Sequence, residues 1–216
     1  MIVRVWDPIR SVGSLVGKYY KLKGLNIYQF GYNSGMSPLH NHPGDDGTTG
    51  LLGSHRVPKY HPQVEALGAL DEASASLGMA RALARSHLTA SLLLEVQRDL
   101  YKIMTEVASE FNINERFQSL EKARIEWLES QVDEITTGLP PLSGFILPGD
   151  SVPGAALAVA RTAVRRAERR VVELFKTVGG KNPAILVYLN RLSSLCFELE
   201  LLENQAAGSS TTPAKP

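Results

Sequence analysis

Hydrophobic positions recur every three or four residues between residues 61 and 203, which is the spacing that predicts amphipathic α-helices. The pattern predicts five helices, over residues 61–85, 89–111, 119–135, 154–178 and 183–203. A segment with four prolines and four glycines, residues 137–154, separates the third helix from the fourth. Because the connections are short, the sequence predicts an all-α fold, a five-helix antiparallel bundle.

The ends of the fourth helix carry their own signals. Pro153 is expected in its first turn, where a missing N–H costs nothing, with Asp150 or Ser151 as the N-cap. Gly179–Gly180 is expected to end this helix. The third helix has no capping box at its start, so its first residue is not fixed by the sequence.

The two ends of the chain differ in composition from this helical region. Within the first 40 residues five basic side chains face a single acid, Asp7. Such an N-terminus is typical either of an organellar transit peptide or of a disordered or strand-forming extension, and both interpretations stay open. The sequence therefore predicts an N-terminal extension over residues 1–43, a helical domain over residues 44–204 and a disordered tail over residues 205–216.

Composition excludes several classes of protein. The 216 residues include 23 basic and 22 acidic side chains, a balance that argues against a general nucleic-acid-binding protein. The single cysteine, Cys196, excludes an intramolecular disulfide and a cysteine-rich zinc site. No apolar run reaches the roughly 18 residues of a membrane span, so no membrane partner is expected. His40 and His42 lack a carboxylate-rich neighbourhood, so no metal site is expected there.

The fourth helix concentrates positive charge. Residues 161–172, RTAVRRAERRVV, contain five arginines and one acid, Glu168. On a helical wheel, Arg161, Arg165, Glu168 and Arg169 form a stripe beside an alanine-rich face, whereas Arg166 and Arg170 lie further round, where water is expected. The stripe is either a solvated or salt-bridged surface or a polyphosphate site, because guanidinium groups pair phosphate oxygens bidentately.

A glycine-rich segment, HPGDDGTTGLLGSHRVPK over residues 42–59, is a second candidate for phosphate binding. Glycine-rich turns can direct consecutive backbone N–H groups at an anion, and Thr48, Thr49 and Lys59 would add donors. The segment is not a Walker A loop, because that motif's spacing is absent.

Five motifs together resemble a known family. GDDGTTGLLGSHRVPK, ALGALDEASASLGMAR, SGFILPGDS, ARTAVRRAERRVV and YLNRLSSLCF occur in the order found in ATP:cob(I)alamin adenosyltransferases of the PduO type. The resemblance covers residues 44 to about 203. It implies a homotrimer with active sites between subunits, which transfers the 5′-deoxyadenosyl group of ATP, carried with Mg²⁺, to cob(I)alamin. The products would be adenosylcobalamin and triphosphate.

The resemblance also implies partners and a compartment. A cobalamin reductase and an adenosylcobalamin-dependent mutase are possible partners. The compartment would be the cytoplasm in a bacterium or archaeon, or the mitochondrial matrix in a eukaryote.

The resemblance assigns roles to residues of this chain. Arg161 resembles the arginine that pairs with Asp71 across the subunit boundary, and Arg165 resembles the arginine on the triphosphate. Phe145 resembles the aromatic residue that caps the lower corrin face and displaces the axial base, which makes Co(II) easier to reduce. The remaining nucleotide contacts implied by the resemblance are Gly44, Asp45, Gly47, Thr48, Thr49, Lys59, Glu168 and Asn190. No protein ligand for a metal is implied, since Mg²⁺ arrives on ATP.

Three departures from the family pattern affect the phosphate site. MSPLHNHPGDD lacks the family's Tyr-Thr-Arg-Thr-Gly-Asp, Asp46 stands where a lysine is common, and Ser194 replaces an aspartate. A corrinoid-binding escort with weak or no ATP-dependent activity is therefore the alternative function. A di-iron bundle is set aside, because no glutamate has a histidine three residues later.

Overall fold

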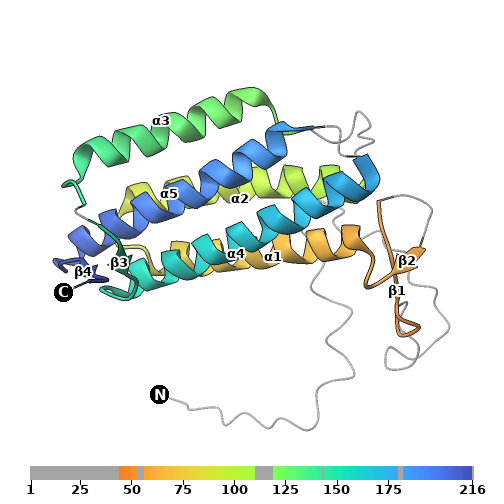
Figure 1. Cartoon of the computed structure of the whole chain (residues 1–216), viewed down its shortest axis with the longest axis horizontal. Coiled ribbons are helices and arrows are strands. Elements are labelled where there is room, and N and C mark those ends of the chain that lie inside the picture. The colour runs from red at the N-terminus through yellow and green to blue at the C-terminus, as the bar shows by residue number, and fades with distance from the viewer. Residues whose placement is uncertain (1–43, 53–55, 110–118, 143, 180–181, 216) are drawn as a thin grey trace, which may run out of the picture. The chain divides into compact units, whose positions relative to one another are not determined.

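The computed structural model describes residues 44–52, 56–109, 119–142, 144–179 and 182–215. The predicted extension over residues 1–43 lies outside them. The described helices are α1 (Pro62–Leu83), α2 (His87–Ala108), α3 (Lys122–Gly138), α4 (Val152–Leu174) and α5 (Ala184–Ala206), as Figure 1 shows. The predicted five-helix fold is confirmed.

The core lies between the five described helices. α4 packs against both α1 and α5, α1 packs against α2, and α3 packs along α5 (Figure 1). The apolar side predicted for the fourth helix is buried, including Ala160, Val164 and Ala167 at 0% exposure. Alanines on this side let the neighbouring helices approach α4 closely. No helix in the described part of the chain is long and apolar enough to cross a membrane.

Helix α4 begins as predicted and ends differently. The Ser151 side chain accepts from Gly154 N at 3.0 Å, so the serine and not Asp150 is the N-cap, and Pro153 lies in the first turn. At the other end the α-helix stops at Leu174 and continues as one π-helical turn, η1 (Phe175–Gly179). Gly179 then adopts a φ of +78°, which ends the element as the glycine predicted.

The described residues also form four short strands. β1 (Thr48–Gly50) and β2 (Arg56–Pro58) form an antiparallel hairpin that precedes α1. β3 (Ile146–Leu147) lies in the loop before α4 and pairs with β4 (Thr212–Pro213) near the C-terminus. The sequence gives no alternating pattern at these strands, because each has only two or three residues.

The C-terminal segment corrects the prediction of a disordered tail over residues 205–216. Residues 205 and 206 belong to α5, and the segment that follows is hydrogen-bonded as far as Ala214, whose N–H donates to the Phe145 carbonyl at 2.8 Å. The prediction failed because polar, low-complexity composition shows only that a segment cannot bury a core of its own. This segment is held by hydrogen bonds to a loop that is distant in sequence.

A buried polar cluster joins three helices. The Asp99 carboxylate of α2, 2% exposed, accepts from Tyr188 Oη of α5 at 2.8 Å and from Arg124 Nε of α3 at 2.8 Å. The Arg124 guanidinium also lies 3.9 Å from the centre of the Trp127 ring. Burial first, and then the adjacent Asp99 carboxylate, raise the pKa of Tyr188 well above its usual value, so the phenol remains a donor.

Replacing Tyr188 with phenylalanine is expected to lower the free energy of unfolding by about 1–2 kcal/mol, because Asp99 loses a buried donor while the ring still packs. For a chain of this size the melting temperature should fall by roughly 2–8 °C. Thermal unfolding of the purified variants measures it. Tyr101→Phe is the matched control, because Tyr101 is 64% exposed on α2 and should show no comparable change. Equal melting of both variants would contradict the role given to the buried hydroxyl.

Candidate functional site

The hairpin before α1 and its flanking residues hold the glycine-rich group of predicted phosphate contacts, Thr48, Thr49 and Lys59. Two glycines shape its first turn, Gly44 with a φ of +114° and Gly47 with a φ of +80°, values that side chains rarely allow. The backbone closes through Gly47 N to Gly44 O at 3.1 Å and Lys59 N to Gly47 O at 2.9 Å. The glycines are therefore required by the shape of this turn.

The Lys59 side chain folds back over this turn. A Cβ on Gly44 would lie 3.6 Å from both Cε and Nζ of Lys59 and 3.2 Å from the Thr48 carbonyl. Lys59 has no carboxylate partner among the described residues. An ammonium group is thus held near exposed backbone at one end of the molecule, an arrangement suited to an anion.

One carboxylate occupies donors of the same hairpin. Asp46 Oδ1 accepts from Thr48 N at 2.9 Å and from Thr48 Oγ1 at 2.8 Å. Arg56 donates from Nε to Thr48 Oγ1 at 2.9 Å and lies 3.7 Å from Asp46. The hydrogen bonds from Thr48, with Arg56 nearby, lower the pKa of Asp46 below its usual value, so the turn carries a negative charge at neutral pH.

On α4 the arginines differ in their partners. Arg166 forms an ion pair with Glu72 of α1, and Arg170 forms one with Glu173 at 3.0 Å. Both arginines are exposed to solvent, as the helical wheel predicted, and α1 in addition places a carboxylate beside Arg166. Arg165 is exposed, and within the described residues its guanidinium has no ion-pair or hydrogen-bond partner.

Arg161 lies on the side of α4 that faces α5. Its guanidinium lies near two buried side chains of α5, Cys196 and Glu200. Burial raises the pKa of Glu200, and the positive charge of Arg161 opposes that rise. The Nε atom of Arg161 is buried and has no hydrogen-bond partner among the described atoms. A donor of this kind needs an acceptor from elsewhere, such as a ligand, water or a second copy of the chain.

Asp71 does not meet Arg161 within one chain. Asp71 is exposed on α1, where its neighbour Glu72 faces Arg166 across the helix contact. Positions 161 and 166 are five residues apart, so they point in directions about 140° apart around the helix. No ion pair joins Asp71 to Arg161 among the described residues, and their pairing across a subunit boundary stays a prediction.

Two predicted nucleotide contacts do lie together. Asn190 Nδ2 of α5 donates to Glu168 Oε1 of α4 at 3.1 Å. The Asn190 amide oxygen accepts from Arg191 Nη1 at 2.9 Å, and Arg191 Nε donates to Glu129 of α3 at 2.8 Å. The resulting row of polar groups crosses three helices, and its Glu168 end lies on the same α4 stripe as Arg165.

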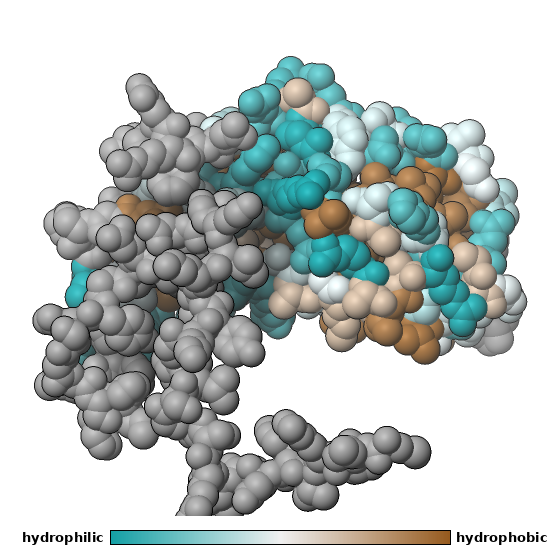
Figure 2. All heavy atoms as spheres, turned by 180° about the vertical axis from the view of Figure 1, so that it is seen from behind, coloured by the Kyte–Doolittle hydropathy of each residue, from teal (hydrophilic) through white to brown (hydrophobic). Residues whose placement is uncertain are grey.

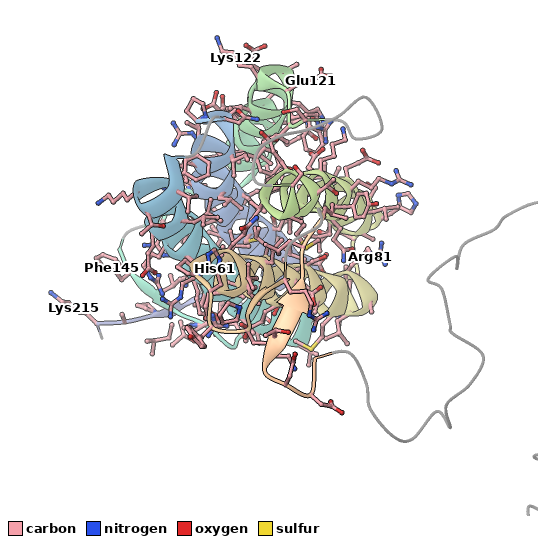
Figure 3. All side chains as sticks on the ribbon, turned by 90° about the vertical axis from the view of Figure 1, so that its right-hand side faces the viewer. His61, Arg81, Glu121, Lys122, Phe145 and Lys215 are labelled. Carbon is pink, nitrogen blue, oxygen red and sulfur yellow. The ribbon has the colours of Figure 1, made fainter. Side chains whose placement is uncertain are left out.

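Phe145 lies in the loop that contains β3, and its ring is 90% exposed. A pocket of about 590 Å³ opens beside it, between residues 141–142 and 144–146 of this loop and residues 211 and 213–215 of the C-terminal segment. Figure 3 shows Phe145 and Lys215 projecting from the same side of the molecule. An exposed aromatic ring beside an open pocket is a plausible platform for a flat ligand.

The candidate residues thus fall into separate groups. The hairpin adjoins the N-terminal end of α1, whereas β3 and Phe145 lie beside the N-terminal end of α4, at the other end of the bundle (Figure 1). Because α1 has 22 residues, the two groups are separated by roughly 30 Å. In the described part of the chain, no group of three or more His, Cys, Asp or Glu side chains could hold a metal ion.

Cys196, on α5 beside Arg161, is expected to be unreactive in the folded protein. Burial raises the pKa of its thiol to about 12, although Arg161 opposes the rise, so about one thiol in ten thousand is ionised at pH 8. A disulfide reagent that reports released thiolate should react only after guanidinium unfolds the chain, with a stoichiometry of one per chain. Stoichiometric reaction within minutes in the native state would contradict the burial of this side chain.

Sequence reasoning missed three contributors to these groups. Arg56 shares the hairpin with Thr48, and a basic residue next to the predicted phosphate donors was the available signal. Arg191 follows Asn190 directly and fixes the orientation of its amide. The segment around Thr212 that lines the Phe145 pocket had no signal, because its contacts to the loop are long-range.

Comparison with known proteins assigns the chain to a family. The family model described as cobalamin adenosyltransferase matches residues 40–203. The corrinoid adenosyltransferase PduO of Citrobacter freundii is 38% identical over 172 residues, which are 78% of this chain and 50% of that protein. The corrinoid adenosyltransferase of Mycobacterium tuberculosis strain H37Rv is 36% identical over 176 residues, covering 78% of this chain and 90% of that protein.

Solved structures agree with these relatives. A variant of the PduO-type ATP:corrinoid adenosyltransferase from Lactobacillus reuteri, complexed with cobalamin and ATP, is 30% identical with a TM-score of 0.74. The match covers 80% of this chain and 97% of that one. The chain spans about half the length of the PduO proteins of Citrobacter freundii and Salmonella typhimurium. By its sequence and its fold, this chain belongs to the cobalamin adenosyltransferase family.

Proposed function

We propose that this chain transfers the 5′-deoxyadenosyl group of ATP to cob(I)alamin, producing adenosylcobalamin and triphosphate. The observation that carries the proposal is the contrast between neighbouring arginines of α4. Arg166 and Arg170 are paired with carboxylates, whereas Arg165, on the stripe that ends at Glu168 and Asn190, has no partner among the described residues. The solved relative with cobalamin and ATP supports this assignment of ligands.

The reaction does not require a nucleophile from the protein, because the cobalt of the substrate is itself the nucleophile. The cobalt of cob(I)alamin attacks C5′ of ATP with an electron pair, the Co–C bond forms, and the C5′–O bond breaks with its pair leaving on triphosphate. Cobalt is thereby oxidised from Co(I) to Co(III). The protein must hold a leaving group with roughly four negative charges, for which Arg165 and Lys59 supply preorganised positive charge.

The active site is proposed to be shared between copies in a homotrimer. The hairpin and the loop that carries Phe145 lie at opposite ends of the bundle within one chain (Figure 1). They are too far apart to contact the same pair of ATP and corrinoid molecules. Asp71 is exposed without an ion pair among the described residues, and Arg161 has an unpartnered buried Nε. These two groups are complementary, and in a closed ring each copy would supply one to each neighbour.

Exposed apolar side chains support association between copies. Met79 of α1 and Val159 of α4 are about half exposed, on the two helices that carry Asp71 and Arg161. Figure 2 shows further hydrophobic areas among hydrophilic ones on the rear face of the bundle. Exposed apolar patches on a soluble bundle commonly mark interaction surfaces.

Magnesium is proposed to enter with the nucleotide. Mg²⁺ is usually held largely by substrate phosphates and waters, so no protein ligand is assigned to it here. When bound, the ion would neutralise part of the charge on the triphosphate. The reaction takes in cob(I)alamin and releases adenosylcobalamin, so a cobalamin reductase and an adenosylcobalamin-dependent mutase are the expected partners. They would share the cytoplasm of a bacterium or archaeon, or the mitochondrial matrix of a eukaryote.

One observation favours a different function, a corrinoid-binding escort with weak ATP use. Asp46 occupies both Thr48 donors, so a phosphate group must compete with a carboxylate already in place. Repulsion between the Asp46 carboxylate and a phosphate group beside it would reduce the affinity for nucleotide.

The test is an anaerobic reaction of purified chain, pre-reduced cob(I)alamin and MgATP, followed by the visible spectrum and by triphosphate release. The proposal predicts adenosylcobalamin and triphosphate in equal amounts, with no product when ATP is omitted. A corrinoid spectral shift on adding protein, without product, would favour the escort instead. The absence of both signals would contradict both functions.

A further inference from the structure

We infer that the C-terminal segment, residues 207–215, is a strap that positions Phe145, with Thr212 and Asp150 as its positioning residues. The inference rests on the proposed function, because it takes Phe145 to be the residue that meets the corrinoid. It adds a role for a part of the chain that the family match, residues 40–203, does not reach.

The loop that carries Phe145 has little of its own to hold it. It is rich in proline and glycine, and within its described residues the only regular element is β3, of two residues. Leu142 and Leu147 are exposed along with Phe145, so the loop is not anchored by burying these side chains. Without external contacts such a segment samples many conformations.

The C-terminal segment supplies those contacts on both sides of Phe145. Ala214 N donates to the Phe145 carbonyl at 2.8 Å, and β4 pairs with β3 directly after it. Thr212 donates two hydrogen bonds to the Asp150 carboxylate, from N to Oδ2 at 3.1 Å and from Oγ1 to Oδ1 at 2.6 Å. The backbone on either side of the ring is therefore fixed while the ring itself stays exposed.

The strap is in turn anchored to the ends of two long helices. Ser209 N donates to the Asn204 carbonyl at 3.0 Å where α5 ends. The buried Asn204 side chain accepts from Ser151 Oγ at 2.6 Å, and Ser151 caps α4. A Cβ on Gly154 would come within 2.2 Å of Asn204 Oδ1, so glycine is needed for this approach. The hydrogen bond between Ser151 and Asn204 thus fixes the end of the loop before α4 relative to α5.

The same segment forms the second wall of the pocket beside Phe145. Thr211 and Lys215 line it opposite Leu142 and Phe145. A corrinoid seated on the Phe145 ring would therefore contact the strap. Displacement of the lower axial base depends on the position of the Phe145 ring. The strap, which sets that position, should therefore affect how readily cob(II)alamin loses this base.

The experiment compares the wild-type chain with a chain ending at Ala206, with Thr212→Val and with Ser210→Ala. Thr212→Val removes only the hydroxyl that grips Asp150, so it keeps the test valid if the truncated chain fails to fold. Ser210 is exposed in the same segment, and its side chain forms no hydrogen bond among the described residues, so Ser210→Ala is the matched control. Hydrogen exchange of residues 144–150 without any ligand reports the strap itself.

Truncation and Thr212→Val are expected to raise the exchange rates of residues 144–150 about tenfold. Both should also lower the fraction of cob(II)alamin that loses its axial base in the presence of ATP, as seen by electron paramagnetic resonance. For Thr212→Val, whose side chain does not line the pocket, the dissociation constant for ATP and turnover of pre-formed cob(I)alamin should stay within about twofold of wild type, as should every property of Ser210→Ala.

Wild-type exchange rates, or a wild-type cob(II)alamin spectrum, in both altered chains would overturn the inference alone. If the wild-type chain itself neither binds cobalamin nor turns it over, the proposed function fails and the inference fails with it. The two failures are thus distinguished by the behaviour of the unaltered chain.

Discussion

Replacing Arg165 with alanine is expected to lower kcat about 100-fold or more while the melting temperature changes by no more than about 2 °C. Removing one preorganised donor from a developing charge typically costs a factor of roughly 10²–10³ in kcat. The folded chain loses nothing comparable, because the guanidinium is exposed and has no partner among the described residues. Steady-state kinetics with varied ATP and pre-reduced cob(I)alamin, together with thermal unfolding, measure both effects.

Arg170→Ala is the matched control for Arg165. Arg170 lies on the same helix, five residues further on, and its guanidinium pairs only with the exposed Glu173. Its loss should leave kcat and KM within about twofold, because exposed ion pairs contribute little. Wild-type kcat and KM for ATP in Arg165→Ala would show that this residue does not bind the leaving triphosphate. Equal losses in both variants would point instead to the general positive potential of α4.

Replacing Phe145 with alanine is expected to separate the two oxidation states of the substrate. With cob(II)alamin and a mild reductant the rate should fall about tenfold to 100-fold, because the lower axial base is no longer displaced and reduction to Co(I) becomes harder. With chemically pre-formed cob(I)alamin, which needs no such displacement, the rate should stay within about threefold. The fold should tolerate the change, since the ring is 90% exposed.

Tyr101→Ala controls for removal of an exposed aromatic ring elsewhere. Tyr101 is 64% exposed on α2, and it does not line the pocket beside Phe145. It should behave as wild type with either form of cobalamin. If Phe145→Ala lost the same factor with Co(I) as with Co(II), its role would lie in binding the corrinoid and not in displacing the axial ligand.

The helical core could be predicted because each helix carries its own periodic pattern. On α4 the buried positions Ala160, Val164 and Ala167 are those that the wheel placed together, and Pro153 and Ser151 mark the start. Such signals are local: they come from residues within one or two turns of each other. Local signals of this kind determine which face of a helix is buried, and the buried face of α4 is the one that they predicted.

The contacts that the sequence did not indicate are the long-range ones. Arg166 meets Glu72 and Thr212 meets Asp150 only after the bundle has formed, 94 and 62 residues apart in the chain. The C-terminal segment was predicted as disordered from its polar, low-complexity composition. Composition could not reveal the hydrogen bonds that hold it, because most of them come from backbone groups. The candidate site was only partly predictable for the same reason: residues were identified by motif, but their distribution over both ends of the bundle required the structure.

The most direct measurement of a site shared between copies uses mixed chains. Lys59→Ala damages the hairpin and Phe145→Ala damages the loop at the other end, so each variant alone should be slow with cob(II)alamin, MgATP and a mild reductant. Co-expressed with different tags and purified as mixed oligomers, the two should form some sites with an intact hairpin from one copy and an intact loop from another. Random mixing in equal amounts predicts about one quarter of the wild-type rate of adenosylcobalamin formation. A mixed preparation no faster than the average of the two variants would contradict the shared site.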